Sequence, residues 1–265
     1  MKQVFNYKGN IIVEEVPSPA VSSGEVLVEV FYSCISTGTE VSVLSSGKKS
    51  FIKRALEKPE NLKKVLDMIK EKGLVNSYSK IVSKLEKPGI MGYSASGIIK
   101  EVGKDVFDFK IGDKVACAGA GLANHAEYIS VPKNLVVKIP EGLLMKNAST
   151  IALGAISLQG VRRCDVKIGE FVVVLGLGIL GIITVQLLNL SGCRTIGIDL
   201  EQKRIDLAES LGLYRGINAK NSDVDDRVIE ITNGYGADAV ILTAASRDDL
   251  LINQAVKFCR RKGKV

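Results

Sequence analysis

The chain contains two regions with different hydrophobic repeats. Up to about residue 145, short segments of alternating or consecutive apolar residues are bounded by Pro, Gly and Asn, which is the pattern of β-strands. These segments are NIIVEEV (10–16), EVLVEVFYSC (25–34), SGIIKEVG (96–103), DKVACAG (113–119), HAEYISVP (125–132) and LVVKIP (135–140). Their number and short spacing predict a compact β-barrel.

A helical repeat interrupts these strands at about 48–88. Between Pro59 and Gly73, four apolar residues recur at three- and four-residue spacing, as in an amphipathic helix with a proline at its start and a glycine at its end. These residues are Leu62, Val65, Leu66 and Ile69. A second short helix is predicted over 77–85, so the barrel carries a helical insertion.

The second region alternates apolar strands with helices, after a predicted connecting helix in 140–164. The predicted strands are EFVVVLG (170–176), RTIGIDL (194–200), YRGINA (214–219) and ADAVILTAA (237–245). The predicted helices are ILGIITVQLLNLSG (179–192), EQKRIDLAESLG (201–212), DVDDRVIEITNG (223–234) and RDDLLINQAVKFCRRKG (247–263). This order is typical of βαβ units around a parallel sheet.

The fold class is therefore α/β, with a β-barrel domain at 1–145 and a doubly wound parallel sheet at 146–265. Four strands are predicted in the second domain, and GKV at the C-terminal end would begin a fifth. A complete dinucleotide-binding sheet has about six strands. We therefore expect the sequence to be a fragment that is cut inside this domain.

The composition is that of an ordinary globular protein, with 46% apolar and 25% charged residues. The N-terminus has no long apolar run, so neither a signal peptide nor a membrane span is expected. The five cysteines lie far apart and form no Cys-x-x-Cys pair. Reduced thiols in a cytoplasmic protein are the resulting expectation.

The net charge of +7 is concentrated in the helical insertion. Between Lys48 and Lys87 there are twelve Lys or Arg residues and five Asp or Glu residues. This segment is either a solvated helical face or a surface that attracts an anionic substrate. Nucleic acid is not an expected partner, because Phe51 and Tyr78 are the only aromatic residues there.

A glycine fingerprint lies between the first strand and the first helix of the second domain. Gly176 permits a tight turn, Gly178 lets the backbone approach a pyrophosphate, and Gly181 lets the helix pack on the strand. Ile179 and Leu180 begin the helix, whose N-terminal amides would bind the phosphates. The pattern in this context predicts dinucleotide binding.

Asp199 ends the next strand, 18 residues after Gly181. Its carboxylate would accept hydrogen bonds from the adenosine ribose and repel a 2′-phosphate, which favours NAD over NADP. Arg204 could still reach a 2′-phosphate, and Asp199 could instead cap the helix at 201–212. Thr243, at the end of the fourth strand, completes the predicted cofactor-binding set.

The order of barrel, linking helix and Rossmann half resembles the medium-chain dehydrogenase/reductase family, whose catalytic domain is GroES-like. The motifs that carry the resemblance are TGTEVSVL (37–44), MGYSASGIIKEVGKDVFDFKIGDKV (91–115) and the glycine fingerprint with Asp199. The resemblance implies that NAD(P) binds between the domains and that hydride passes to or from a carbonyl or alcohol carbon.

Zinc-dependent members of that family hold their metal with Cys and His residues. At the matching places this chain has Thr37, Tyr93 and Ala152 or Leu153, none of which is a zinc ligand. The four-cysteine structural zinc loop is also missing, and no zinc is expected. The chain resembles a zinc-less branch that forms the N-terminal part of two-domain oxidoreductases of sugar and polysaccharide metabolism.

Without zinc, hydrogen-bond donors must meet the charge on the substrate oxygen. Tyr93 occupies the place of the zinc-binding histidine, and Thr39 matches the hydroxyl residue that relays a proton. His125 is the only histidine and has the side chain best suited to proton transfer near neutral pH. Each could instead be structural, and Glu40 matches an acid that supports the site from behind.

The expected function is that of a zinc-independent, NAD(H)-linked oxidoreductase acting on a polar, sugar-like or anionic small molecule. One alternative is a quinone- or enone-reductase-like enzyme that uses NADPH. Another is a nucleotide-binding module or fragment without catalysis. No membrane partner is expected, and a homo-oligomer of the full-length protein is left open.

Overall fold

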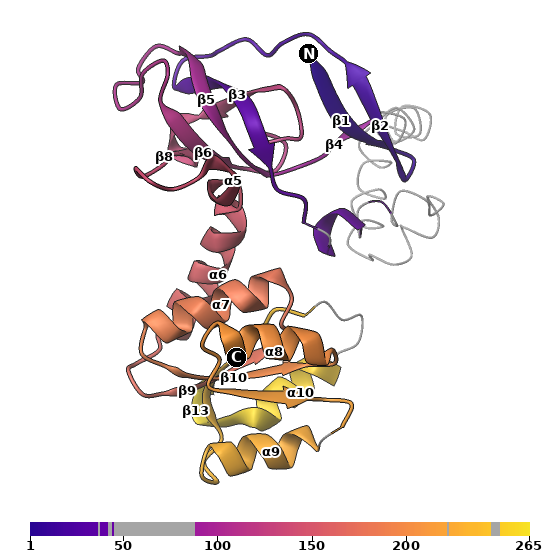
Figure 1. Cartoon of the computed structure of the whole chain (residues 1–265), viewed down its shortest axis with the longest axis vertical. Helices are drawn as coiled ribbons and strands as arrows, with labels where there is room; N and C mark the ends of the chain where they lie inside the picture. Colours follow the sequence, from indigo (N-terminus) through magenta and orange to yellow (C-terminus); the bar gives the residue numbers. More distant parts are fainter. Residues whose placement is uncertain (37, 42–43, 45–87, 222, 245–249) are drawn as a thin grey trace, which may run out of the picture. The chain divides into compact units, whose positions relative to one another are not determined.

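The computed structural model describes residues 1–36, 38–41, 44, 88–221, 223–244 and 250–265 (Figure 1). They form two compact units, the N-terminal unit Met1–Ala152 and the C-terminal unit Leu153–Val265. The predicted helical insertion at 48–88 lies outside the described residues, apart from Pro88.

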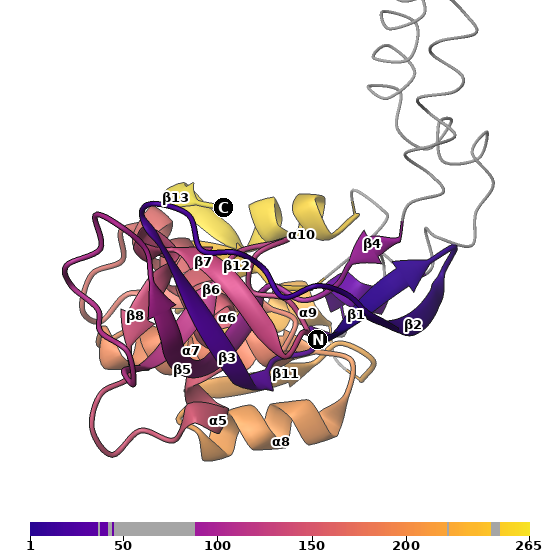
Figure 2. The ribbon, with the colours of Figure 1, turned by 90° about the horizontal axis from the view of Figure 1, so that it is seen from above.

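The N-terminal unit is built on a five-stranded antiparallel sheet with strand order β7-β3-β5-β6-β8. Its strands are β3 (Glu25–Ser33), β5 (Ser94–Val102), β6 (Lys114–Ala118), β7 (Tyr128–Pro132) and β8 (Val136–Lys138), the last preceded by the 3-10 turn η1 (Lys133–Leu135). Figure 2 shows β3, β5 and β6 side by side. The sheet curls into the GroES-like half-barrel that the sequence predicts.

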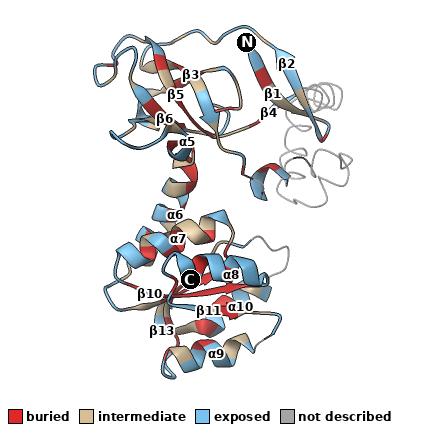
Figure 3. Cartoon of the chain, viewed as in Figure 1, coloured by how far each residue is buried: buried red, intermediate tan, exposed pale blue. Residues whose placement is uncertain are grey.

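A second sheet of this unit has the order β2-β1-β4. It consists of β1 (Lys2–Tyr7), β2 (Asn10–Glu15) and β4 (Gly89–Ile90), of which only β2 is predicted from the sequence. The core lies inside the five-stranded sheet, where alternate residues of neighbouring strands are fully buried (Figure 3). Val26, Val28, Ile99, Val115 and Val131 are all 0% exposed.

The single helix predicted in 140–164 is wrong, because the structure contains two helices, α5 (Met145–Ala148) and α6 (Ile151–Cys164). The Ser149 and Thr150 hydroxyls donate back to the carbonyls of Lys146 and Asn147 and thereby end the first helix. From β5, the buried Ser94 hydroxyl donates to Ser149 O (2.6 Å) and accepts the amide of Ala152 (3.1 Å).

The C-terminal unit has a five-stranded parallel sheet with the order β11-β10-β9-β12-β13. The strands are β9 (Phe171–Leu175), β10 (Arg194–Asp199), β11 (Arg215–Asn218), β12 (Ala237–Leu242) and β13 (Cys259–Lys264). The helices are α7 (Ile179–Leu190), α8 (Gln202–Ser210), α9 (Val224–Ile231) and α10 (Leu250–Phe258). This is the order of a dinucleotide-binding sheet, in which successive strands are added on one side of β9 up to β11 and then on its other side from β12.

Both faces of this sheet are covered by helices. Val172 and Val174 of β9 pack with α7 and α8, whereas Val173 and Leu175 pack with α9 and α10. Because both faces of the strand are buried, its sequence is apolar without alternation.

The last predicted helix, 247–263, is wrong at its C-terminal end. The structure ends α10 at Phe258 and begins β13 at Cys259, parallel to β12. Arg260 of this edge strand pairs with Asp238, which also accepts the amide of Phe171 (2.8 Å). An edge strand rich in basic residues lacks the apolar pattern by which strands are recognised.

Within the described part of the chain, every helix is too short or too polar to cross a lipid bilayer.

We expect Ser94→Ala to lower the unfolding free energy of the N-terminal unit by about 2 kcal/mol, because it leaves a buried carbonyl and a buried amide without partners. The matched control is Ser23→Ala, which removes an exposed hydroxyl bonded to Asp105. Exposed changes of this kind usually cost less than about 0.5 kcal/mol. The measurement is urea unfolding followed by tyrosine fluorescence and circular dichroism, and equal shifts in the two variants would contradict the assignment.

Candidate functional site

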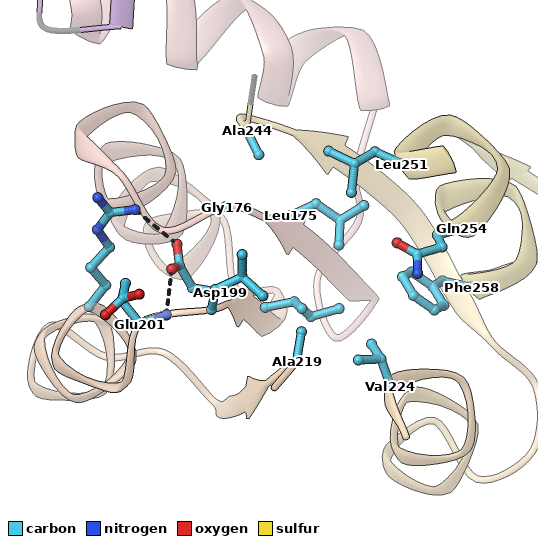
Figure 4. A pocket seen from close by; sticks show the side chains of 13 residues that line it. Leu175, Gly176, Asp199, Glu201, Ala219, Val224, Ala244, Leu251, Gln254 and Phe258 are labelled. Atoms are coloured by element: carbon cyan, nitrogen blue, oxygen red, sulfur yellow. Dashed lines mark hydrogen bonds and ion pairs between the residues drawn. The ribbon is translucent and has the colours of Figure 1, made fainter. Parts of the chain in front are cut away.

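A pocket of about 700 Å³ opens at the carboxyl ends of the parallel strands in the C-terminal unit (Figure 4). Its wall is apolar on one side, where Leu251 and Phe258 of α10 face Val224 of α9. Asp199 and Glu201 supply the polar side. A pocket with one apolar wall and one acidic edge suits an adenosine group.

The glycine turn borders this pocket. Gly176 has φ +95°, and a Cβ there would lie 2.7 Å from the Cβ of Ala244. At Gly181 a Cβ would lie 2.0 Å from the carbonyl oxygen of Gly176, so the first turn of α7 lies directly on the loop after β9. Both positions therefore require glycine.

The N-terminus of α7 is open to an anion. Gly178 is its N-cap, no side chain caps it, and a Cβ at Gly178 would meet nothing within 4 Å. The amides of Ile179 and Leu180 have no acceptor within the helix, as is general for a first turn. The geometry fits a pyrophosphate held by these amides and by the helix dipole.

Asp199 is held firmly at the edge of the pocket and is 8% exposed. Its Oδ2 accepts the amide of Leu177 (2.7 Å), its Oδ1 accepts the amide of Glu201 (2.9 Å), and Arg204 Nη1 lies 3.5 Å from Oδ2. Burial raises the pKa of this carboxyl, but the two amides and Arg204 together hold it below its ordinary value. The group is therefore an anion at neutral pH.

Asp199 is not the N-cap of α8, although it contacts the N-cap residue. The N-cap of α8 is Glu201, and no side chain caps that helix. Asp199 bonds the amide of this N-cap residue, while its position in the pocket lining leaves it facing the cavity as well.

Thr243 ties β12 to the glycine turn. Its amide donates to Leu175 O (2.9 Å), and its hydroxyl lies 2.5 Å from Gly176 O and 3.0 Å from Leu175 O. The hydroxyl proton is thus used inside the protein, and the side chain links the end of β12 to the loop after β9.

In the N-terminal unit, His125 lies in a group that the sequence does not predict. Its Nδ1 is 2.8 Å from Ser33 Oγ, and its Nε2 is 3.2 and 3.3 Å from the two carboxylate oxygens of Glu40. Burial, together with the charge of Glu40, raises the pKa of the neighbouring Cys34 thiol. Sequence reasoning missed Ser33 and assigned Glu40 a supporting role without a partner.

Among the described residues, neither of the other two predicted catalytic residues forms a hydrogen bond with this histidine. Thr39 is exposed, and its hydroxyl accepts a hydrogen bond from Ser36 Oγ (3.3 Å). Tyr93 is half-buried between β4 and β5, and none of the described residues forms a hydrogen bond with its phenol.

The described residues do not fit a zinc site. Tyr93 and Ala152 supply no metal ligand, and Thr37 lies outside the described residues. Across the described ranges, no group of three or more His, Cys, Asp and Glu side chains is placed to hold a metal ion.

Comparison with known proteins reveals two matching domain models. Residues 66–141 match the alcohol dehydrogenase GroES-like domain, and residues 180–265 match the domain described as zinc-binding dehydrogenase. D-guloside 3-dehydrogenase of Escherichia coli K12 is 35% identical over 162 residues, which are 60% of this chain and 46% of that protein. The match thus spans about half the length of this relative.

Other relatives cover more of the chain at lower identity. An alcohol dehydrogenase of Geobacillus stearothermophilus is 28% identical over 84% of this chain and 75% of its own. Among solved structures, the E. coli quinone oxidoreductase complexed with NADPH has a TM-score of 0.75 at 17% identity, covering 99% of this chain and 71% of that one. The 2R,3R-butanediol dehydrogenase of Bacillus subtilis has a TM-score of 0.74 at 20% identity, covering 100% and 76%.

The two domain models match in the order that the half-barrel and the parallel sheet have in the structure. Solved oxidoreductases with this architecture share the fold across nearly the whole chain. The chain belongs to the medium-chain dehydrogenase/reductase family.

Proposed function

We propose that the chain is the nucleotide-binding and catalytic part of a zinc-independent, NAD(H)-linked oxidoreductase that acts on a polar, sugar-like substrate. The observation that carries this proposal is the pocket at the glycine turn, with an ionised Asp199 at its edge. That combination supports binding of a dinucleotide whose ribose hydroxyls are free.

The charges around Asp199 favour NAD(H) over NADP(H). A 2′-phosphate would lie against the carboxylate and be repelled. Arg204 is a basic residue of the pocket lining, but it is already paired with Asp199 and its charge is thereby compensated. NADP(H) would have to draw Arg204 away from this partner.

The bound nicotinamide ring would supply or accept a hydride, and the residues of the chain would hold the reactants and move the proton. The amides of Ile179 and Leu180 would hold the pyrophosphate, and Asp199 would bind the adenosine ribose. Tyr93 would donate a hydrogen bond to the substrate oxygen, with Thr39 and His125 as further candidates for proton transfer.

Independence from zinc is proposed because the matching residues are not metal ligands. The phenol of Tyr93 would take over part of the task that the metal performs, which is to stabilise charge on the oxygen.

The substrate class is proposed from the relatives. One is named for a D-guloside and another for an alcohol, which supports a sugar or polyol hydroxyl as the reacting group. A small-molecule substrate and a cytoplasmic location belong to the proposal, and neither a nucleic acid nor a membrane does.

A quinone reductase that uses NADPH is the second candidate function. The similarity in fold to the quinone oxidoreductase complexed with NADPH favours it. The ionised Asp199 argues against it, and cofactor preference separates the two candidates.

We expect NADH to bind at least tenfold more tightly than NADPH, a difference of about 1.4 kcal/mol, because the 2′-phosphate meets the Asp199 carboxylate. The measurement is a fluorescence titration of the chain with each nucleotide. Asp199→Asn removes the charge and should reduce the preference, whereas Asp206→Asn, on the exposed side of α8, should leave it unchanged. Tighter binding of NADPH by the wild type would contradict the assignment and favour the second candidate.

We expect Tyr93→Phe to lower the NAD-linked oxidation rate of a methyl D-guloside roughly 10²-fold, the scale of one lost hydrogen bond to the substrate oxygen. The affinity for NADH and the unfolding midpoint should stay at their wild-type values, because no described residue bonds to the phenol. Tyr235→Phe, at a position 80% exposed, is the control. Unchanged turnover in Tyr93→Phe would exclude the phenol from the reaction.

A further inference from the structure

Glu40, His125 and Ser33 form a continuous chain of side-chain hydrogen bonds in the N-terminal unit. Glu40 comes from the short helical segment 38–41, His125 from the loop before β7, and Ser33 from the last position of β3. His125 is 85 residues from Glu40 and 92 from Ser33 in sequence. Tertiary packing, not local geometry, therefore brings the three side chains together.

The surroundings of Glu40 fix the direction of these hydrogen bonds. Glu40 is 8% exposed, and its Oε1 already accepts the amide of Ser36 (3.0 Å). In the described part of the chain, His125 is the only side chain that forms a hydrogen bond with its carboxylate. A carboxylate can only accept, so the Nε2–H of His125 donates to it, and this leaves Nδ1 to face Ser33 Oγ.

The same arrangement works for both forms of the ring. In the neutral ring, Nδ1 accepts the Ser33 hydroxyl proton, as in a hydroxyl–histidine–carboxylate triad. In the charged ring, Nδ1–H donates to Ser33 Oγ, and the hydroxyl proton is free to point elsewhere. The Glu40 carboxylate accepts the Nε2–H hydrogen bond in both states. It therefore holds the ring in one orientation while Nδ1 gains or loses its proton.

Only the Ser33 end of the chain is placed to meet a ligand through a hydroxyl. Ser33 and His125 both line a cavity of about 360 Å³, but the His125 side chain is only 9% exposed. The Glu40 side chain is 11% exposed and does not line this cavity. Phe31 and Val30 form apolar parts of its wall, and Lys2 and Glu127 add charge. A cavity of this mixed character suits a polyol with one apolar face.

We infer that these residues form the proton relay of the oxidoreductase reaction, an inference that rests on the proposed function. Ser33 is the catalytic residue that exchanges a proton with the substrate oxygen, to which the Tyr93 phenol donates a hydrogen bond in the proposed function. His125 acts through Ser33, and Glu40 is a positioning residue.

In carbonyl reduction, the hydride adds to the carbon and the π pair moves to the oxygen. That oxygen takes the proton of the Ser33 hydroxyl, Ser33 Oγ takes the Nδ1 proton, and His125 is left neutral with Nε2–H on Glu40. In alcohol oxidation, the substrate proton passes to Ser33, the Ser33 proton passes to Nδ1, and the C–H pair leaves as hydride. Atoms and charges balance in both directions.

The first test measures the hydrogen-bond chain without any turnover. His125 is the only histidine, so its ring ¹⁵N signals need no assignment. In the neutral form of the ring, wild type should contain only the Nε2–H tautomer, and Ser33→Ala should keep it. Glu40→Ala should mix the tautomers, whereas Glu127→Ala, the loss of an exposed carboxylate at the same cavity, should not. An Nδ1–H tautomer in the wild type, or no effect of Glu40→Ala, would overturn the relay.

The second test uses the full chain with NAD and a methyl D-guloside. Ser33→Ala and Glu40→Gln should lower kcat at least 10²-fold and leave the Kd of NADH within twofold. Ser33→Thr, which keeps the hydroxyl, should restore much of the rate, and this rescue would not occur if the serine only packed the site. Glu40→Gln has nearly the same shape as the wild-type side chain, so it keeps the test valid if Glu40→Ala fails to fold.

The solvent isotope effect separates a relay from a single proton donor. In mixtures of H₂O and D₂O, the rate of the wild type should depend on the deuterium fraction along a curve, because two protons move together. The rate of Ser33→Ala should depend on it linearly. Normal turnover of Ser33→Ala would overturn the relay alone. Failure of the wild type to bind NADH or to oxidise the glycoside would overturn the proposed function, and the relay with it.

Discussion

The close contact between the first turn of α7 and the loop after β9 is the constraint on which the candidate nucleotide site depends. Because Gly181 has no side chain, the helix packs directly against the Gly176 carbonyl. A Cβ at Gly181 would lie 2.0 Å from that carbonyl oxygen. This contact aligns the helix N-terminus with the strand end, so that the amide of Leu177 points at Asp199 (2.7 Å). A larger residue would displace the helix and, with it, the amides, the carboxylate and the pocket edge together.

The sequence predicts this part of the molecule well because the requirement is local. The turn with φ +95° at Gly176 and the close packing of α7 on it both require glycine, at a fixed spacing in the sequence. The continuous apolar sequence of β9 likewise indicates that both faces of the strand are buried. The end of α10 is different. There the edge strand β13 is specified by its pairing with β12, which no local repeat of apolar residues reveals.

The contacts among Ser33, His125 and Glu40 could not be predicted from the sequence, for a similar reason. The register between β3 and β5 shifts between Val30 and Tyr32, so the alternation that places Val26 and Val28 inside cannot be continued to Ser33. A β-bulge of this kind re-aims the following side chains. Its presence depends on the partner strand, and for that reason the sequence indicates His125 and Glu40 separately but not their contact.

The energetics of this group point to function more than to stability. Removing a carboxylate and an imidazole from water is costly, and a well-packed apolar pair of similar size is often as stable or more so. The folding free energy alone therefore gives Glu40 and His125 no clear advantage over apolar residues at these positions. Their arrangement makes sense if the N-terminal unit must store and release a proton, whereas the C-terminal unit must hold a dinucleotide. If the two proposed tasks are carried by different residues in different units, loss of the proton chemistry should leave nucleotide affinity intact. This separation would distinguish a catalytic group from a structural one.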